Sequence, residues 1–399
     1  MKQVDCVVIG GGVIGTAVAR SFLKNKKGKK LLLLEKEPKP ALHTSGRNSG
    51  VLHSGINLKP GSLKATLCVE GNKKLREFCL EKKLPFDPVG TLVVAINDSQ
   101  IPILEELKRR GDANGTPNVQ IVSQKELAEK EPYALGVAAL YSPSGAIASG
   151  KEVTLALADE VAQLGGEIFF SEKVIGIEDK NSKYIVKTSS QVIETENLFN
   201  CAGLYADEIA HMVGVGLDYS IIPFRGEYFK VSNSKKDFIK SMIYPIPDLN
   251  YPFLGVHWTK MVTGELMIGP SATIAMGRES YKNTQIGIKD VFSMITKRNF
   301  WNLFRTEDFR RLAKTQIALS FSRKRFIAEA QKLVRGFEVS DFVMGKNGNR
   351  AQLVRSNGKL VDDMIVEKKG NSVHVLNAVS PGFTCALPFA DYLIDQMFN

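Results

Sequence analysis

The chain has 399 residues, 44% hydrophobic and 24% charged, which is ordinary for a globular protein and predicts two domains. No apolar run is long enough to span a bilayer, and the first strand-like run follows Met1 closely, which indicates no signal or transit peptide. Five cysteines without a C-x-x-C pair predict reduced thiols in a cytoplasmic protein, with no metal site. The net charge of +11 favours anionic partners, but no zinc-finger or aromatic RNA-binding motif accompanies it, so we expect no nucleic acid.

The first predicted element is a strand that enters a glycine turn. An apolar run at residues 7–9 leads into Gly10, Gly12 and Gly15 at G-x-G-x-x-G spacing, and a helical apolar pattern follows. The next apolar run ends at Glu35, twenty residues past the last of these glycines.

Each part of this unit answers a physical need of dinucleotide binding. Gly10 permits the tight turn, Gly12 lets a pyrophosphate approach the backbone, and Gly15 lets the helix pack closely on the sheet. The helix N-terminus offers free N–H groups to the phosphates, and Glu35 can accept hydrogen bonds from a ribose diol. The sequence therefore predicts a βαβ unit that binds a dinucleotide.

The remaining elements alternate between strands and helices. Residues 41–57, rich in Gly, Ser, His and Asn, are expected to form a long functional loop. Apolar periodicity predicts helices at residues 62–83, 101–110, 124–130, 151–164 and 288–335, and strands at residues 92–96, 166–170, 174–177, 184–188, 191–194, 198–201 and 372–378, with further strands over 221–270 and a final helix.

Two later strands are expected to end beside the first glycine turn. Residues 198–201 and 372–378 both run into small residues, and ligands of open α/β sheets lie at the carboxyl ends of strands. The nucleotide domain is then discontinuous, comprising residues 1–85, 146–215 and 346–399. Residues 86–145 and 216–345 form the substrate domain. The predicted fold is α/β and α+β: a Rossmann-like domain with a second, mixed-sheet domain.

Several motifs together resemble a known family. They are GGGVIG, TSGRNSGVLHSGINLKPGSLKA at residues 44–65, FNCAGLYAD at 199–207, PFRGEYF at 223–229, YPIPD at 244–248, PFLGVH at 252–257 and NGKLVDD at 357–363. These resemble the FAD-dependent oxidoreductases of the D-amino-acid oxidase / glycerol-3-phosphate dehydrogenase superfamily. The resemblance is closer to the L-2-hydroxyglutarate dehydrogenases, also called oxidases, and it runs nearly end to end.

The resemblance implies an activity and a cofactor. The family oxidises L-2-hydroxyglutarate to 2-oxoglutarate: a hydride passes to N5 of FAD while a base takes the hydroxyl proton. We expect FAD to be held without a covalent bond, and the electron acceptor, quinone or oxygen, stays open. The alternatives are another anionic substrate on the same fold, glycerol 3-phosphate or an amino acid, and a non-catalytic FAD-binding protein.

The resemblance also carries over the residues that bind the cofactor. They are Gly10, Gly12, Gly15, Glu35, Lys36, Ser45, Gly46, Asn48, Ser49, Ala202, Gly203, Gly382 and Phe383. The C-terminal turn, NAVSPGFTCALP, departs from the glycine-rich loop that is frequent in the superfamily. Lys36 has a second interpretation, as a solvated surface residue.

Histidine is the preferred general base because its pKa lies near neutrality. Of five histidines, His53 lies in the loop that resembles the flavin-contacting loop, and His257 is the second candidate. His211 and His374 are interpreted as structural, and His43 is placed on the adenosine side.

A dicarboxylate substrate needs donors at both ends, and arginine binds a carboxylate bidentately. Arg350 aligns with the carboxylate-binding arginine of amine-oxidising relatives, and Arg225 is the other candidate, with a structural role at a strand turn equally open. Tyr228 and Tyr244 are candidate hydroxyl donors, with core packing as the alternative.

An aromatic and basic segment at residues 297–314, KRNFWNLFRTEDFRRLAK, has two interpretations. One is an interfacial helix on the inner face of a membrane, with its apolar side chains at the headgroup boundary and its cations on anionic lipid. The other is a core-facing helix with a solvated basic face.

Overall fold

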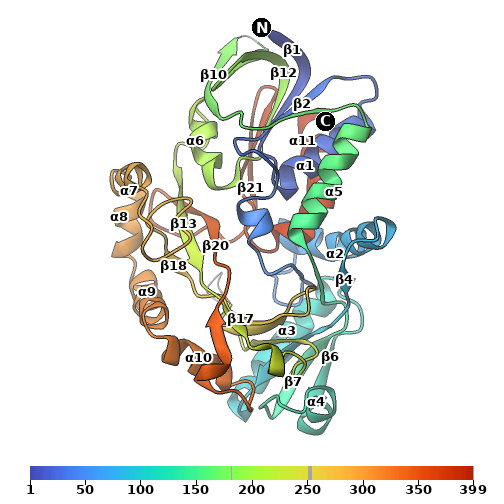
Figure 1. The fold of residues 1–399 in the computed structure, drawn as a ribbon, viewed down its shortest axis with the longest axis vertical. Helices are drawn as coiled ribbons and strands as arrows, with labels where there is room; N and C mark the ends of the chain where they lie inside the picture. The colour runs from blue at the N-terminus through green and yellow to red at the C-terminus, as the bar shows by residue number, and fades with distance from the viewer. Residues whose placement is uncertain (181, 250–253, 399) are drawn as a thin grey trace.

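The computed structural model describes residues 1–180, 182–249 and 254–398. At the top of Figure 1 lies a large sheet in the order β10-β11-β12-β1-β2-β9, with β22 beside β12 and β21 beside β22. Its strands are β1 (Lys2–Ile9), β2 (Leu31–Leu34), β9 (Glu167–Phe169), β10 (Val174–Lys180), β11 (Lys183–Thr188), β12 (Val192–Asn200), β21 (Ile365–Lys369) and β22 (Ser372–Asn377).

The centre of this sheet is parallel and covered on both faces. β1 pairs in parallel with β2 and β12, and β12 pairs in parallel with β22. β2 is four fully buried leucines, the continuous apolar pattern of a strand that is covered on both sides. One face carries α1 (Val13–Asn25), α5 (Gly150–Gln163) and α11 (Gly382–Phe398), and α2 (Leu63–Glu81) packs on α11. The other face carries α6 (Ala206–His211).

One long strand replaces two expected ones. Residues 191–194 and 198–201 were predicted as separate strands, but β12 runs unbroken from Val192 to Asn200. On the edge that faces away from β1, the first half of β12 pairs with β11 and the second half pairs with β22. The polar residues between the two apolar runs do not interrupt the strand because its backbone is hydrogen-bonded to β1 along its whole length.

The second large sheet has the order β19-β14-β17-β16-β15-β5-β7-β6. Its strands are β5 (Thr91–Ala95), β6 (Gln120–Ser123), β7 (Ala138–Ser142), β14 (Phe229–Val231), β15 (Met242–Pro245), β16 (His257–Lys260), β17 (Leu266–Gly269) and β19 (Phe342–Met344). Alternation along β5 sends Leu92 and Val94 into the core under α10 (Arg323–Gln331), and Val93 and Ala95 into the core under α3 (Ile101–Ala113). The short helix α4 (Gln124–Lys130) follows β6.

Two three-stranded sheets complete the described strands. In β18-β13-β20, the long strands β13 (Tyr219–Gly226) and β20 (Gly348–Arg355) pair over eight positions and run between the two large sheets (Figure 1). In β3-β8-β4, the strand β3 (Val51–Leu52) lies within the expected loop of residues 41–57. The remaining strands are β4 (Phe86–Asp87), β8 (Ala146–Ala148) and β18 (Thr273–Ile274).

The helical segment expected at residues 288–335 is four helices. They are α7 (Ile288–Ile295), α8 (Arg298–Arg305), α9 (Glu307–Ser320) and α10. The single helix expected over residues 297–314 is therefore wrong, because the chain turns into an extended conformation at Thr306, between α8 and α9. Leu303 and Phe309 are buried against β13, while Trp301 is 56% exposed.

The first large sheet draws strands from the beginning, middle and end of the chain, and the second draws on the segments between. The division into two domains at the residue boundaries given above stays a prediction.

Candidate active site

A cavity of about 550 Å³ opens at the carboxyl ends of the parallel strands. Its lining begins at Gly10 after β1, Glu35 after β2, Cys201 after β12 and Ala378 after β22. It then continues toward the second sheet as far as Tyr244 and His257. The cavity size is that of a small-molecule or cofactor site.

The structure brings most of the predicted residues to this one cavity. Among its lining residues are Gly10, Gly12, Glu35, Lys36, Ser45, Asn48, Ser49, His53, Ala202, Gly203, Tyr228, Tyr244, His257, Arg350, Gly382 and Phe383. Gly15, Gly46 and Arg225 do not line it.

The first glycine turn has the geometry that its spacing predicts. Gly10 has φ +109°, and a Cβ there would lie 2.4 Å from the carbonyl oxygen of Cys201. A Cβ at Gly15 would lie 1.9 Å from the carbonyl oxygen of Gly10, so this glycine serves close packing rather than ligand contact. α1 begins after Gly12 with no side-chain cap and no acidic residue in its first turn, which leaves the positive end of the helix dipole facing the cavity.

Glu35 stands where the ribose-binding acid was predicted. It is 8% exposed, and its carboxylate accepts hydrogen bonds from the backbone N–H of Gly11 at 2.7 Å and of Glu37 at 2.9 Å. Each oxygen has one such donor and retains a lone pair for a further one.

The loop after β2 folds over the start of α1. Ser45 accepts a hydrogen bond from the N–H of Val13 at 2.9 Å, and Asn48 donates to the carbonyl of Ser45 at 2.9 Å. Gly46 has a different role from its neighbours, since a Cβ there would lie 2.0 Å from the carbonyl oxygen of Ala41. This glycine allows the loop to close on itself.

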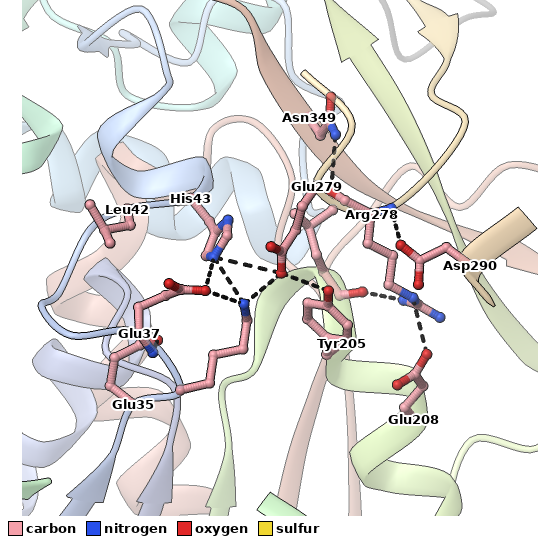
Figure 2. Close-up of polar contacts among 12 residues, drawn as sticks. Glu35, Glu37, Leu42, His43, Tyr205, Glu208, Arg278, Glu279, Asp290 and Asn349 are labelled. Carbon is pink, nitrogen blue, oxygen red and sulfur yellow. Dashed lines mark hydrogen bonds and ion pairs between the residues drawn. The ribbon is translucent and has the colours of Figure 1, made fainter. Parts of the chain in front are cut away.

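A polar network lies at the nucleotide side of the cavity (Figure 2). Lys36 forms ion pairs with Glu37 and Glu279, and its Nζ lies 3.1 Å from Nε2 of His43. Burial opposes the charge of Lys36, but its hydrogen bonds to the two carboxylates outweigh burial and raise its pKa. Glu37, His43 and Glu279 are close enough together to hold a metal ion, but the Lys36 ammonium already supplies the cation among them. The interpretation of Lys36 as a solvated surface residue does not fit these contacts.

The same network ties the segment after β18 to the first sheet. Arg278 donates to both carboxylate oxygens of Asp207 at 2.8 and 3.1 Å, in an almost fully buried pair. Arg278 also pairs with Glu208, and Tyr205 donates to Glu279 at 2.6 Å (Figure 2). His43 bonds to the hydroxyl of Tyr281, which places this histidine on the nucleotide side as expected.

His53 lies at the opposite end of the cavity. Burial lowers its pKa to about 4, and the nearby Lys64 adds to this effect. Its imidazole is therefore neutral at pH 7 and able to accept a proton. Nε2 lies 3.2 Å from Oγ of Ser380.

His257 and Tyr244 form a stacked pair beside it, with ring centroids 4.1 Å apart. Burial lowers the pKa of His257 to about 3, and its Nδ1 is bonded to the carbonyl of Gly255 at 2.8 Å. The hydroxyl of Tyr244 is buried and has no hydrogen-bond partner among the described residues. An orphaned buried donor in a cavity wall is a position where a ligand acceptor fits.

Arg350 is a positively charged residue in the part of the cavity that holds Tyr244 and His257. Burial lowers its pKa, an effect that Tyr228 partly offsets, and Nη1 donates to the carbonyl of Ser271 at 3.0 Å. The pKa of Tyr228 is raised by burial, against the opposing effects of Arg350 and a hydrogen bond with Ser49.

Arg225 does not line the cavity with Arg350, although the two residues lie on paired strands. Its guanidinium donates to the carbonyl of Lys282 at 3.3 Å and to the side chain of Asn283, and its Nε lies 3.5 Å from Glu227. These contacts match the structural role at a strand turn. His374 and His211 also have internal contacts that fit structural roles, with Asn200 and Ser372 for the first and the carbonyl of Gly216 for the second.

Several residues of the cavity were not selected from the sequence. Arg47, Tyr205, Asn349, Ser380 and Thr384 all line it. Four of them lie within or next to quoted motifs, so proximity to a motif was a usable signal. Asn349 adjoins Arg350, and in the part of the chain that the structure describes its buried Oδ1 has no hydrogen-bond partner. Of the quoted motif PFLGVH, Pro252 and Phe253 lie outside the described residues.

The donors present fit FAD. The N-terminus of α1, which has no cap from Gly12, suits a pyrophosphate, Glu35 suits a ribose diol, and the long cavity continues from them to a histidine- and arginine-lined end.

Comparison with known proteins agrees with this geometry. The sequence profile of the family described as FAD dependent oxidoreductase matches residues 5–396. The L-2-hydroxyglutarate dehydrogenase of Indibacter alkaliphilus is 40% identical over 382 residues, which cover 96% of this chain and 95% of that protein. The mitochondrial L-2-hydroxyglutarate dehydrogenase of Homo sapiens is 33% identical over 410 residues, covering 98% and 88%. The chain belongs to the FAD-dependent oxidoreductase family.

A solved structure supports the fold and the cofactor. The L-alpha-glycerophosphate oxidase of Mycoplasma pneumoniae with FAD bound has a TM-score of 0.80 at 25% identity, and the match covers 100% of this chain and 95% of that one. The family resemblance, the Rossmann-like α/β architecture and the FAD cofactor that the sequence predicted are confirmed.

Proposed function

We propose that the protein oxidises L-2-hydroxyglutarate to 2-oxoglutarate with FAD. One observation carries the proposal: the cavity that begins at the dinucleotide turn ends at a histidine, a partly buried arginine and a tyrosine hydroxyl that has no hydrogen-bond partner among the described residues. The relatives named as L-2-hydroxyglutarate dehydrogenases, up to 40% identical, support the choice of substrate. FAD, when bound, accepts the hydride from the substrate carbon.

The residues at the end of the cavity that holds His53, called the far end from here on, have complementary roles in this proposal. His53 takes the hydroxyl proton, since its imidazole is neutral at pH 7, and His257 is the second candidate. Loss of the hydride and of this proton converts the carbinol to the ketone.

Charge and hydrogen bonding fit the two carboxylates of the substrate. Arg350 binds one of them, and the hydroxyls of Tyr228 and Tyr244 donate to the other acceptors. Arg350 lines the same cavity as His53 and supplies a positive charge there, and partial burial strengthens an ion pair with a substrate carboxylate.

The test is anaerobic reduction of the purified yellow protein. L-2-Hydroxyglutarate is expected to bleach the flavin absorbance, and D-2-hydroxyglutarate at the same concentration is not. Bleaching by glycerol 3-phosphate or an amino acid instead would establish a different substrate on the same fold. A yellow protein that none of these reduces would establish a non-catalytic FAD-binding protein. Reoxidation by oxygen, compared with a soluble quinone, then identifies the acceptor.

We also propose a peripheral membrane contact by α7 and α8. Ile288 and Phe292, one turn apart on α7, are 80% and 67% exposed, and Trp301 on α8 is 56% exposed. Lys289 and Arg298 are exposed on the same helices. Among the described residues, no helix is long and apolar enough to cross a bilayer. Exposed apolar side chains with neighbouring cations fit an anionic lipid surface.

Vesicle binding tests this contact. Binding to anionic vesicles is expected to weaken with salt, with Phe292→Ser/Trp301→Ser and with Lys289→Glu/Arg298→Glu, and neutral vesicles are expected to bind less. A protein that ignores anionic vesicles at low salt has ordinary helix packing at this surface.

A further inference from the structure

The main chain of His53 is held on both sides by buried polar side chains. Its N–H donates to Oγ1 of Thr384 at 3.0 Å, and its carbonyl accepts from Nδ2 of Asn72 at 3.1 Å. Thr384 lies in the first turn of α11 and is fully buried, and Asn72 lies on α2 and is 6% exposed. The two helices that pack on each other thus both hold this residue.

Thr384 connects the strand before His53 to the helix. Its hydroxyl donates to the carbonyl of Val51 at 3.3 Å while it accepts from the N–H of His53. Asn72 donates in addition to the carbonyls of Leu52 at 3.4 Å and Ser144 at 3.0 Å. The chain has only two residues of strand at this point, so these side chains replace the hydrogen bonds that a longer strand would supply.

The imidazole of His53 is contacted by the same C-terminal segment. Oγ of Ser380 lies 3.2 Å from Nε2, four residues before Thr384. One turn of the chain therefore reaches both the backbone and the ring of His53. The other ionisable groups near this ring are Lys64 of α2 and His257 of β16.

We propose that Thr384 and Ser380 are positioning residues for His53: the first fixes its backbone and the second orients its ring toward the substrate hydroxyl. The inference rests on the proposed function, in which His53 is the base. Proton transfer requires a donor–acceptor distance of about 2.6–3.2 Å, and a misplacement of about 1 Å can cost a hundredfold in rate. A base that directly follows a two-residue strand needs such external support.

Thr384→Val keeps the shape of the side chain and removes the hydroxyl. We expect unchanged FAD content and substrate KM, and anaerobic flavin reduction slower by roughly tenfold to a hundredfold. Freed from its buried position, the ring gains solvent, so the acidic limb of the kcat/KM profile moves to higher pH. Thr384→Ser restores the hydroxyl and both measurements. Thr154→Val is the matched control, since Thr154 is also fully buried in the first turns of a helix and its hydroxyl donates to the backbone carbonyl of Gly150 on α5.

A double variant distinguishes positioning from a separate contribution. If Thr384 acts through His53, Thr384→Val adds no loss in a His53→Ala background. Equal losses in both backgrounds, or a Thr384→Val enzyme with the normal rate and pH profile, overturn the inference.

Should Thr384→Val fail to fold, Ser380→Ala tests the same proposal at an exposed side chain. A lower kcat at unchanged KM, rescued by Ser380→Thr, supports the proposal, and an unchanged kcat overturns it. Failure of L-2-hydroxyglutarate to bleach the unmodified protein would instead contradict the proposed function itself.

Discussion

The two ends of the cavity are built in different ways. At the nucleotide end, the glycine turn, the first turn of α1 and Glu35 all come from the first 35 residues, and backbone groups supply most of the contacts. At the far end, His53, Tyr244, His257 and Arg350 come from four separate segments, and side chains supply the chemistry. Substitutions at the first end should therefore affect cofactor retention, and those at the second should affect rate and substrate affinity.

Gly12→Val tests the nucleotide end and has the largest expected effect. Even a Cβ at Gly12 would lie 3.1 Å from Oγ of Ser45, and the larger side chain extends over the uncapped helix end where the pyrophosphate is expected. We expect loss of the bound flavin, measured as loss of the yellow absorbance. Gly176→Val is the control, since the nearest atom to a Cβ there is 4.0 Å away. A Gly12→Val protein with full flavin would contradict the assignment of this end.

His53→Ala tests the far end. Removing a general base should slow anaerobic flavin reduction by about a hundredfold or more, with the flavin content unchanged. Since burial lowers the pKa of His53 to about 4, the unmodified enzyme should hold its rate down to about pH 5 and lose it as His53 is protonated below that. The variant should lack this acidic limb. Near-normal reduction with the same pH profile would move the role to His257.

Arg350→Lys and Arg225→Lys form a matched pair that compares a partly buried and a fully buried arginine on paired strands. Arg350→Lys keeps the charge but loses the planar fork, so the substrate should bind about 1.5–3 kcal/mol more weakly, a tenfold to hundredfold rise in KM. Arg225→Lys should lower the melting temperature and leave KM unchanged, because its contacts are internal. Equal KM values for Arg350→Lys and the unmodified enzyme would exclude Arg350 as the carboxylate anchor.

Glu279→Gln has the smallest expected effect. It removes one carboxylate from the network of Figure 2, but the buried Arg278–Asp207 pair still connects the same segment to the first sheet. We expect FAD to dissociate a few times faster, which is measured as the recovery of flavin fluorescence after dilution. The rate of flavin reduction should be unchanged. Glu167→Gln, which removes an exposed ion pair with Lys2 of the same sheet, should leave dissociation unchanged. A slower reductive step in Glu279→Gln would mean that the two ends are not independent.

The glycine turn of the nucleotide end could be predicted from the sequence alone, whereas Tyr205 and Glu279 reach this end only through the fold. The turn at Gly10 depends on a positive φ and the packing at Gly15 on the absence of a Cβ, and both are properties of single residues in a local segment. Strand and helix periods are also local, so the βαβ unit and most helices were predicted within a few residues. The same local periods wrongly predicted two strands in place of β12 and one helix in place of α8 and α9. Pairing with β1 and packing against β13 depend on the tertiary structure and leave no local pattern in the sequence.

Only the tertiary structure decided the far end. Arg225 and Arg350 are both arginines on strands, yet one is engaged by Asn283 and Glu227 while the other lines the cavity. The contacts of His53 with Thr384 and Ser380 join residues more than 300 positions apart. Such contacts depend on which strands pair and which helices pack, and on the burial that results. Residue type predicted a histidine base, and the burial that the fold imposes lowers the pKa of His53 below its ordinary value, to about 4.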